Sequence, residues 1–292
     1  MSHPGWLTLA ALVAALLLSA CAPVATLNAI ASASPGYEAE TGVAYAAEPR
    51  QRLDIYRPTA KPPANGWPLV VFFYGGSWNS GSRDEYKFVG TALASRGVVT
   101  LVADYRLYPE VRYPDFLVDS AQALAWGLEH TQQLNADPKR VFVMGHSAGG
   151  YNAAMLALDS RWLKTAGHLP SELAGWIGLA GPYDFLPTDN PLAQPVFFHP
   201  NYPAHAQPIE FPSAQSPRTF LGAPEHDELV DPTRSTRSLA AKLEAAGAPV
   251  TLKIYERPSH AVLIGAFALP LRWIAPVLND VTDFIGSAPP AR

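Results

Sequence analysis

The sequence predicts an α/β fold in which a mostly parallel sheet carries helices on both faces. Short runs rich in Val, Leu and Phe recur along the chain, and longer segments with helical periodicity separate them. The apolar runs are continuous rather than alternating, which is typical of strands that are buried on both faces. Because 48% of the 292 residues are hydrophobic, the chain has enough apolar material for one large core.

The individual elements follow from the same patterns. We expect about eight strands, and seven of them are placed at residues 51–56, 68–74, 98–104, 141–144, 176–180, 219–221 and 250–255. Helices are expected at residues 85–96, 113–128, 149–158, 233–246 and 271–284. In such sheets, reacting groups gather at the carboxyl ends of the strands. The residues that directly follow each strand are therefore the candidates for chemistry.

Residues 182–217 interrupt this alternation. The segment contains nine prolines and several aromatic residues. Proline at this density prevents long helices, so we expect an irregular cap over the strand ends. A loop of this length in a compact domain usually has a function, although a surface loop without substrate contact is the alternative.

The N-terminus belongs to a different physical class. Residues 6–20 carry no charge and have the length of the apolar region of a signal peptide, which is too short to cross a membrane comfortably. The run ends in Leu-Ser-Ala-Cys, which resembles the lipobox of bacterial lipoproteins and implies lipidation of Cys21, the only cysteine. We expect a signal peptide at 1–20, a tether at 21–36 and the folded domain at 37–292.

The same resemblance predicts where the protein is found. Ala22 stands where an Asp would mark retention in the inner membrane, so an exported protein anchored to the outer membrane is expected. A secreted or periplasmic protein with an ordinary signal peptide is the alternative. The net charge of −4 and the pI of about 6.1 give no electrostatic reason to expect a nucleic-acid partner.

Residues 145–149, Gly-His-Ser-Ala-Gly, match the G-x-S-x-G pattern of a nucleophile elbow. In an elbow, a sharp turn between a strand and a helix presents the serine hydroxyl, so the flanking positions need small residues. The pattern alone is weak, but an expected strand precedes it and an expected helix follows it. Ser147 is therefore the candidate nucleophile.

A glycine pair, Gly75-Gly76, follows the expected strand at 68–74. The surrounding run F-F-Y-G-G-S-W resembles the H-G-G-G or H-G-G-x-W loop of α/β-hydrolases related to hormone-sensitive lipase and to small bacterial esterases. In that family, backbone N–H groups hold the oxyanion that forms during acyl transfer. The resemblance implies that these donors are the N–H groups of Gly75, Gly76, Ser77 and Ala148.

Two more parts of the chain agree with this family. Tyr74 stands where relatives usually have His, and its hydroxyl is expected to brace the loop; Tyr74 and Trp78 are both expected in the substrate pocket. Residues 104–110, D-Y-R-L-Y-P-E, are similar to the D-Y-R-L-x-P-E block of the same esterases. We expect Arg106 and Asp119 to have structural roles only.

The family order Ser, Asp, His implies the remaining groups. His260 follows the last expected strand, where the family places its base, and Asp227 is the favoured acid because D-E-L-V matches the family's D-x-x-V. Glu225 is the nearest rival, whereas Asp231 precedes Pro232 and Thr233 and is suited to capping a helix. Such a triad needs no metal or organic cofactor.

The resemblance implies an esterase that acts on small to medium or aromatic acyl groups. An amidase, formamidase or peptidase on the same fold is the alternative, because amide and ester hydrolases share these catalytic groups. A non-catalytic, membrane-tethered binding protein is a third possibility, but such proteins typically lose the Ser or His, and both are present here.

Overall fold

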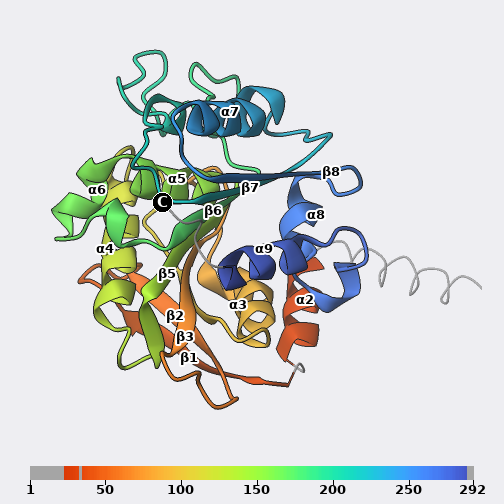
Figure 1. Cartoon of the computed structure of the whole chain (residues 1–292). Coiled ribbons are helices and arrows are strands. Elements are labelled where there is room, and N and C mark those ends of the chain that lie inside the picture. The colour runs from red at the N-terminus through yellow and green to blue at the C-terminus, as the bar shows by residue number, and fades with distance from the viewer. Residues whose placement is uncertain (1–22, 33–34, 288–292) are drawn as a thin grey trace, which may run out of the picture.

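The computed structural model describes residues 23–32 and 35–287 and has a single eight-stranded sheet between helices (Figure 1). The strand order is β1-β2-β4-β3-β5-β6-β7-β8. The bounds of the strands are β1 Tyr37–Ala44, β2 Arg52–Pro58, β3 Trp67–Phe73, β4 Val99–Ala103, β5 Ala136–His146, β6 Gly175–Leu179, β7 Thr219–Pro224 and β8 Val250–Tyr255. The predicted fold class is confirmed.

Strands β4, β3, β5, β6, β7 and β8, in their order across the sheet, are parallel to one another, and only the edge formed by β1 and β2 is antiparallel. Strand β2 pairs antiparallel with β1 on one side and with β4 on the other. Strand β1 was not among the strands expected from the sequence. It is largely exposed along its length, and its sequence Y-E-A-E-T-G-V-A lacks the apolar run that marks the buried strands.

Helices cover both faces of the sheet. In Figure 1, α4 and α5 lie on one side of the strands, and α3 and α9 lie on the other. The helix bounds are α2 Pro23–Ser32, α3 Lys87–Ala94, α4 Asp115–Glu129, α5 Ala148–Leu158, α6 Ser160–Thr165, α7 Ser238–Ala245, α8 His260–Gly265 and α9 Val277–Gly286. A single π-helical turn, Thr233–Arg237, precedes α7, within the range predicted as one helix.

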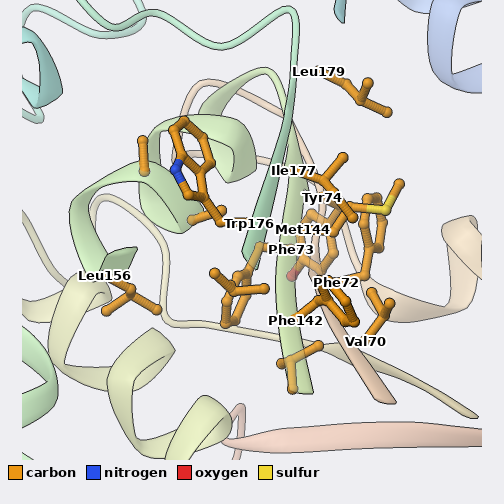
Figure 2. Close-up of a cluster of buried hydrophobic side chains, with 14 of the residues drawn as sticks. Val70, Phe72, Phe73, Tyr74, Phe142, Met144, Leu156, Trp176, Ile177 and Leu179 are labelled. Atoms are coloured by element: carbon orange, nitrogen blue, oxygen red, sulfur yellow. The ribbon is translucent and has the colours of Figure 1, made fainter. Parts of the chain in front are cut away.

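The core is built from the central strands β3, β5 and β6. Their side chains alternate between the two faces, as strand geometry requires. In Figure 2, Trp176 and Leu156 of α5 lie on one side of the strands. The other side holds Val70, Phe72, Phe142, Met144, Ile177 and Leu179. The register pairs Phe73 with Gly145 and Gly145 with Gly178, which brings the ends of these three strands together.

The segment expected to be a tether contains a docked helix. Helix α2 packs against α3, and Asn28 accepts a hydrogen bond from the backbone N–H of Phe88 at 3.1 Å and donates one to the carbonyl of Asp84 at 2.7 Å. Ala31 is buried against the core. Residues 23–32 of the predicted tether thus form a helix, whose Leu27 and Ala31, one turn apart, pack against the core. The predicted signal peptide and Cys21 lie outside the described residues.

Residues 182–217 form an irregular cap whose one regular element is a 3₁₀ turn, Pro208–Glu210. Hydrogen bonds hold the cap in place. The Tyr151 hydroxyl donates to the carbonyl of Ala206 at 2.7 Å, and the side-chain oxygen of Gln207 accepts from the backbone N–H groups of Phe185 and Leu186 at 2.6 and 2.7 Å. The irregular conformation predicted from the proline content is therefore present.

Candidate active site

Ser147 lies at a strained turn between β5 and α5. Its φ of 55° and ψ of −124° are rare for a residue with a side chain, and such strain concentrates at functional sites. A Cβ atom on Gly145 would lie 1.9 Å from the carbonyl oxygen of Gly149, and one on Gly149 would lie 2.1 Å from the carbonyl oxygen of Phe73. The elbow therefore needs glycine at both positions.

The loop that follows β3 packs directly against this elbow. A Cβ atom on Gly75 would lie 2.8 Å from the Cβ of Ser147, so a side chain there would collide with the serine. The next residues are conformationally unusual, since Gly76, Ser77 and Trp78 have φ values of 123°, 49° and 59°. The structure thus brings the predicted glycine loop and the predicted nucleophile together.

The predicted oxyanion donors gather around the elbow. Ser77 and Ala148 line the pocket beside Ser147. Gly75 packs directly against Ser147, and Gly76 links it to Ser77. The candidate donors remain the N–H groups of Gly75, Gly76, Ser77 and Ala148.

Tyr74 does not line the pocket, which corrects one prediction. Its ring is fully buried and stacks on Tyr105 with a centroid distance of 5.0 Å. Its hydroxyl donates to Asp104 at 2.7 Å and accepts from Arg50 at 2.9 Å. Burial, and then the charge of Asp104, raise the pKa of Tyr74 well above its usual value. At the end of β3, the Tyr74 side chain points into the core rather than into the pocket. There its hydroxyl holds the glycine loop in place through Asp104 and Arg50.

Arg50 is a loop-bracing residue that the sequence did not reveal. Besides Tyr74, its guanidinium donates to the carbonyls of Tyr105, at 2.9 Å, and of Gly81. These partners belong to the ends of β3 and β4 and to the glycine loop. No motif marks Arg50, because its partners lie 24 to 55 positions away in the chain.

Trp78 lines the pocket, as expected, and is anchored beneath it. Its indole N–H donates to the side-chain oxygen of Asn152 at 3.0 Å, and the Asn152 amide donates to the hydroxyl of Ser120 at 3.2 Å. Asn152 is fully buried on α5, five residues after Ser147. The Asn152 amide fixes the indole ring of Trp78, which follows the glycine loop. No sequence motif identified Asn152.

His260 and Asp227 form a buried pair beside the elbow. The Nδ1 atom of His260 lies 2.8 and 3.0 Å from the two carboxylate oxygens of Asp227. His260 is the first residue of α8, a helix that was not among those expected from the sequence. The opposite ring nitrogen, Nε2, is buried and has no hydrogen-bond partner among the residues that the structure describes. This nitrogen is therefore available to a group in the site.

Further contacts hold Asp227 in its ionised form. Its Oδ1 atom accepts hydrogen bonds from the backbone N–H groups of Leu229 and Val230, both at 2.9 Å. Burial acts to raise the pKa of Asp227, but hydrogen bonding to His260, the charge of that ring and the two backbone donors together lower it. The carboxylate is set to remain negative beside the imidazole.

The rival carboxylates have other partners. Asp231 accepts from the backbone N–H groups of Thr233 and Arg234 at 2.8 and 3.2 Å, the helix-capping role expected from the sequence. Glu225 pairs with Arg237 at 2.6 Å on the surface. Glu228 reaches the backbone N–H of His260 at 3.3 Å, not its ring.

His146 packs against His260 and forms a hydrogen bond with its backbone. Its Nε2–H donates to the backbone carbonyl of His260 at 3.0 Å, and the two ring centroids lie 4.9 Å apart. Burial, and then the charge of His260, lower the pKa of His146 to about 3. His146 is therefore neutral at physiological pH and has a structural contact rather than a place in the pocket.

The remaining predicted structural pair is also in place. The guanidinium of Arg106 contacts both carboxylate oxygens of Asp119, at 2.9 and 2.7 Å, and Gln51 donates to the same carboxylate at 2.8 Å. Asp119 is fully buried. The bidentate pair ties the end of β4 to the start of α4, and neither residue lines the pocket.

A pocket of about 500 Å³ opens over Ser147 and Ala148. Its lining comes from Trp78 of the glycine loop, from the cap, which includes Phe185, and from the loop after β7. Within the described ranges, no group of three or more His, Cys, Asp or Glu side chains is arranged to hold a metal ion. Likewise, none of the helices in these ranges has the length and apolar character needed to cross a membrane.

Comparisons with known proteins agree with this architecture. Relatives include the probable isoprenylcysteine alpha-carbonyl methylesterase ICME of Oryza sativa, 27% identical over 238 residues that cover 75% of this chain and 57% of that protein. Esterase LipC of Mycobacterium tuberculosis is 28% identical over 221 residues, which cover 70% of this chain and 54% of that protein. The chain thus spans somewhat more than half the length of these relatives.

Solved structures share the fold. Esterase B from Lactobacillus rhamnosis superimposes with a TM-score of 0.71 at 20% identity, covering 94% of this chain and 95% of that one. A hyperthermophilic esterase from Pyrobaculum calidifontis gives 0.69 at 22% identity, covering 90% and 89%. The family model described as BD-FAE matches residues 53–243, more than half of the chain. The chain has the α/β-hydrolase fold and belongs to the BD-FAE family.

Proposed function

We propose that this protein is a serine hydrolase that cleaves carboxylic esters through an acyl-enzyme on Ser147. The observation that carries the proposal is the buried pair of Asp227 and His260. Nε2 of His260 has no hydrogen-bond partner among the described residues, and Ser147 lies at a strained elbow. Support also comes from the pocket over Ser147, which gives an acyl group access to the hydroxyl. The esterase names among the relatives point in the same direction.

The proposed reaction has two steps, the acylation of Ser147 and the hydrolysis of the acyl-enzyme. His260 Nε2 takes the proton of the Ser147 hydroxyl as its oxygen attacks the acyl carbon, and Asp227 stabilises the imidazolium. The N–H groups of Gly75, Gly76, Ser77 and Ala148 are the donors that hold the oxyanion in this proposal. The tetrahedral intermediate collapses as His260 protonates the departing alcohol. Water, deprotonated by the same histidine, then attacks the acyl carbon, and the acid and the serine hydroxyl are released.

The pocket favours small to medium or aromatic acyl groups. Its volume of about 500 Å³ is at the lower end for small-molecule sites, and an irregular cap rather than a mobile helical lid covers it. The stacked rings of Trp78 and Phe185, 5.8 Å apart, offer an apolar wall to a short chain or a ring. We therefore expect activity to fall for acyl chains beyond about twelve carbons, with no activation at lipid interfaces.

A panel of nitrophenyl esters and matched anilides tests this function. The wild-type protein should hydrolyse short-chain esters, and Ser147→Ala should lose several orders of magnitude in turnover, because the nucleophile and its base act as a unit. Unchanged circular dichroism of the variant is the control for folding. Residual activity within tenfold of wild type would refute the role of Ser147, and faster cleavage of anilides than of esters would identify an amidase.

We further propose that the protein is an exported lipoprotein anchored through Cys21, most consistent with the outer membrane. The support is the uncharged run at 6–20 that ends in Leu-Ser-Ala-Cys. Helix α2 begins at Pro23 and packs on the domain, so an anchor at Cys21 would hold the enzyme close to the membrane surface.

A further inference from the structure

The pocket over Ser147 has an unbalanced charge. Four carboxylates line it, and the only cation in its lining is Arg234, so the lining has a formal net charge of −3. These carboxylates belong to the same cavity as the candidate nucleophile, not to a separate surface cluster. They are Asp184, Asp189, Glu228 and Asp231.

The carboxylates come from two segments of the lining. Asp184 and Asp189 belong to the cap, and Glu228 and Asp231 belong to the loop after β7. Arg234 lies 3.4 Å from Asp184 and therefore offsets mainly that charge. Asp189 and Glu228 are both exposed, and neither forms an ion pair among the described residues.

Glu228 also lies close to the reacting groups. Its carboxylate is 3.3 Å from the backbone nitrogen of His260, so a carboxylate that lines the pocket also lies beside the candidate base. On the cap side, Asp189 is followed by Asn190, whose amide lies 3.5 Å from the hydroxyl of Ser77 in the glycine loop. Carboxylates of both segments thus line the pocket that contains Ser147.

An aromatic surface completes the pocket. Phe185 is half-buried and stacks with an interplanar angle of 25° on Trp78, which is only 2% exposed, so Phe185 supplies the accessible ring of the cavity. An aromatic face attracts a cation through its quadrupole, and quaternary ammonium groups are bound in this way. Carboxylates and an aromatic face are independent features, and both favour a positively charged ligand.

We propose that this pocket selects esters that carry a positive charge, accepts neutral esters less well and rejects anionic ones. This inference rests on the proposed esterase function and names the charge class of its substrate. A cleft lined by one sign of charge raises the local concentration of the opposite charge and speeds its association. It also discriminates by repulsion, since a substrate carboxylate would have to approach a lining of net charge −3.

Three aryl acetates of similar shape test the inference on the full-length protein: 3-(trimethylammonio)phenyl, 3-tert-butylphenyl and 3-carboxyphenyl acetate. Each kcat/KM is divided by the rate constant of hydroxide hydrolysis, which removes the difference in leaving-group acidity. We expect the corrected value for the cationic ester to exceed that for its neutral isostere by about tenfold or more. The anionic ester should fall below both.

Variants and salt assign the effect to the pocket. Asp189→Asn and Glu228→Gln should each reduce the cationic-to-neutral ratio several-fold, whereas Asp283→Asn, an exposed carboxylate on α9 outside the pocket, should leave it unchanged. Raising the ionic strength from about 10 mM to about 1 M shortens the screening length from about 30 to 3 Å and should also reduce the ratio.

The outcomes separate the two proposals. If the neutral ester is hydrolysed and the corrected ratio is 1 or less, the charge selection is wrong and the esterase function stands. If none of the three activated acetates is hydrolysed, the esterase function itself is overturned. A ratio above 1 that is insensitive to both pocket variants would also refute the assignment to Asp189 and Glu228.

Discussion

The imidazole Nδ1 of His260 lies 2.8 Å from a carboxylate oxygen of Asp227, and these two side chains are only 4% and 1% exposed. Because Asp227 also accepts two backbone N–H groups, its orientation is fixed before any substrate enters. A carboxylate at Nδ1 keeps the proton on that nitrogen and leaves Nε2 as the base. The first prediction follows from this contact.

Replacing Asp227 with Asn should reduce turnover by up to about 10⁴, because the imidazole loses its required tautomer and the charge that stabilises its protonated form. Asp231→Asn is the matched control from the same loop, since Asp231 caps backbone N–H groups. It should cost about 1 kcal/mol or less of stability and leave kcat near the wild-type value. Measuring kcat and urea unfolding of both variants decides the matter, and the reverse result would exchange their roles.

The second prediction concerns the anchor of the glycine loop. Trp78→Phe removes the indole N–H that Asn152 accepts, and Asn152→Ala removes the acceptor. Each should lower kcat by about tenfold or more with a smaller change in KM, because oxyanion donors act mainly in the transition state. The double variant should lose little more than either single one, since both remove the same contact.

Rate constants for a short nitrophenyl ester, together with the free energy of unfolding, test this coupling. A purely structural role predicts a loss of stability of about 1–3 kcal/mol without a change in kcat. Fully additive losses of kcat in the double variant would show that Trp78 and Asn152 act independently.

The third prediction is a pH dependence of stability caused by His146. Its pKa is about 3 in the folded protein and 6.5 in its ordinary state, so between these values the unfolded chain binds a proton that the folded chain does not. Stability therefore falls as the pH falls from 6.5 towards 3, by about 1.4 kcal/mol per unit. In His146→Gln this contribution is absent.

Urea unfolding of the wild-type protein and of His146→Gln at pH 7 and pH 5 measures this contribution. The stability advantage of the wild type should shrink by about 2 kcal/mol at the lower pH. Since all other groups titrate in both proteins, a constant difference between them would mean that His146 is not held neutral by burial.

The fourth prediction concerns Cys21. If the lipoprotein proposal is correct, mass spectrometry of the protein from its native membranes should show a chain that begins at Cys21 and carries diacylglycerol and an added acyl group. Cys21→Ala should prevent the modification and release the protein from the membrane fraction. An unmodified N-terminus at Ala22 or later in the wild type would instead indicate a secreted or periplasmic enzyme.

The sequence by itself determined the features that depend on neighbouring residues. The apolar runs identified seven of the eight strands. Strands β3, β4, β6 and β7 are buried almost along their whole length and must therefore be apolar, whereas the edge strand β8 alternates between half-buried and exposed residues. The spacing of Gly145 and Gly149 identified the elbow, because the turn leaves no room for a Cβ atom at either position. Proline content likewise predicted the irregular cap.

The tertiary structure alone decided the contacts between residues that are distant in the chain. Asp227 and His260 are 33 positions apart, and only the packing of α8 against β7 shows that this carboxylate, rather than Glu225 or Asp231, faces the ring. The same is true of Arg50 and Asn152, whose partners lie 24 to 74 positions away. The burial of Tyr74 and the packing of helix α2 on the domain have the same explanation. Burial depends on which surfaces meet in space, and a local sequence pattern does not contain that information.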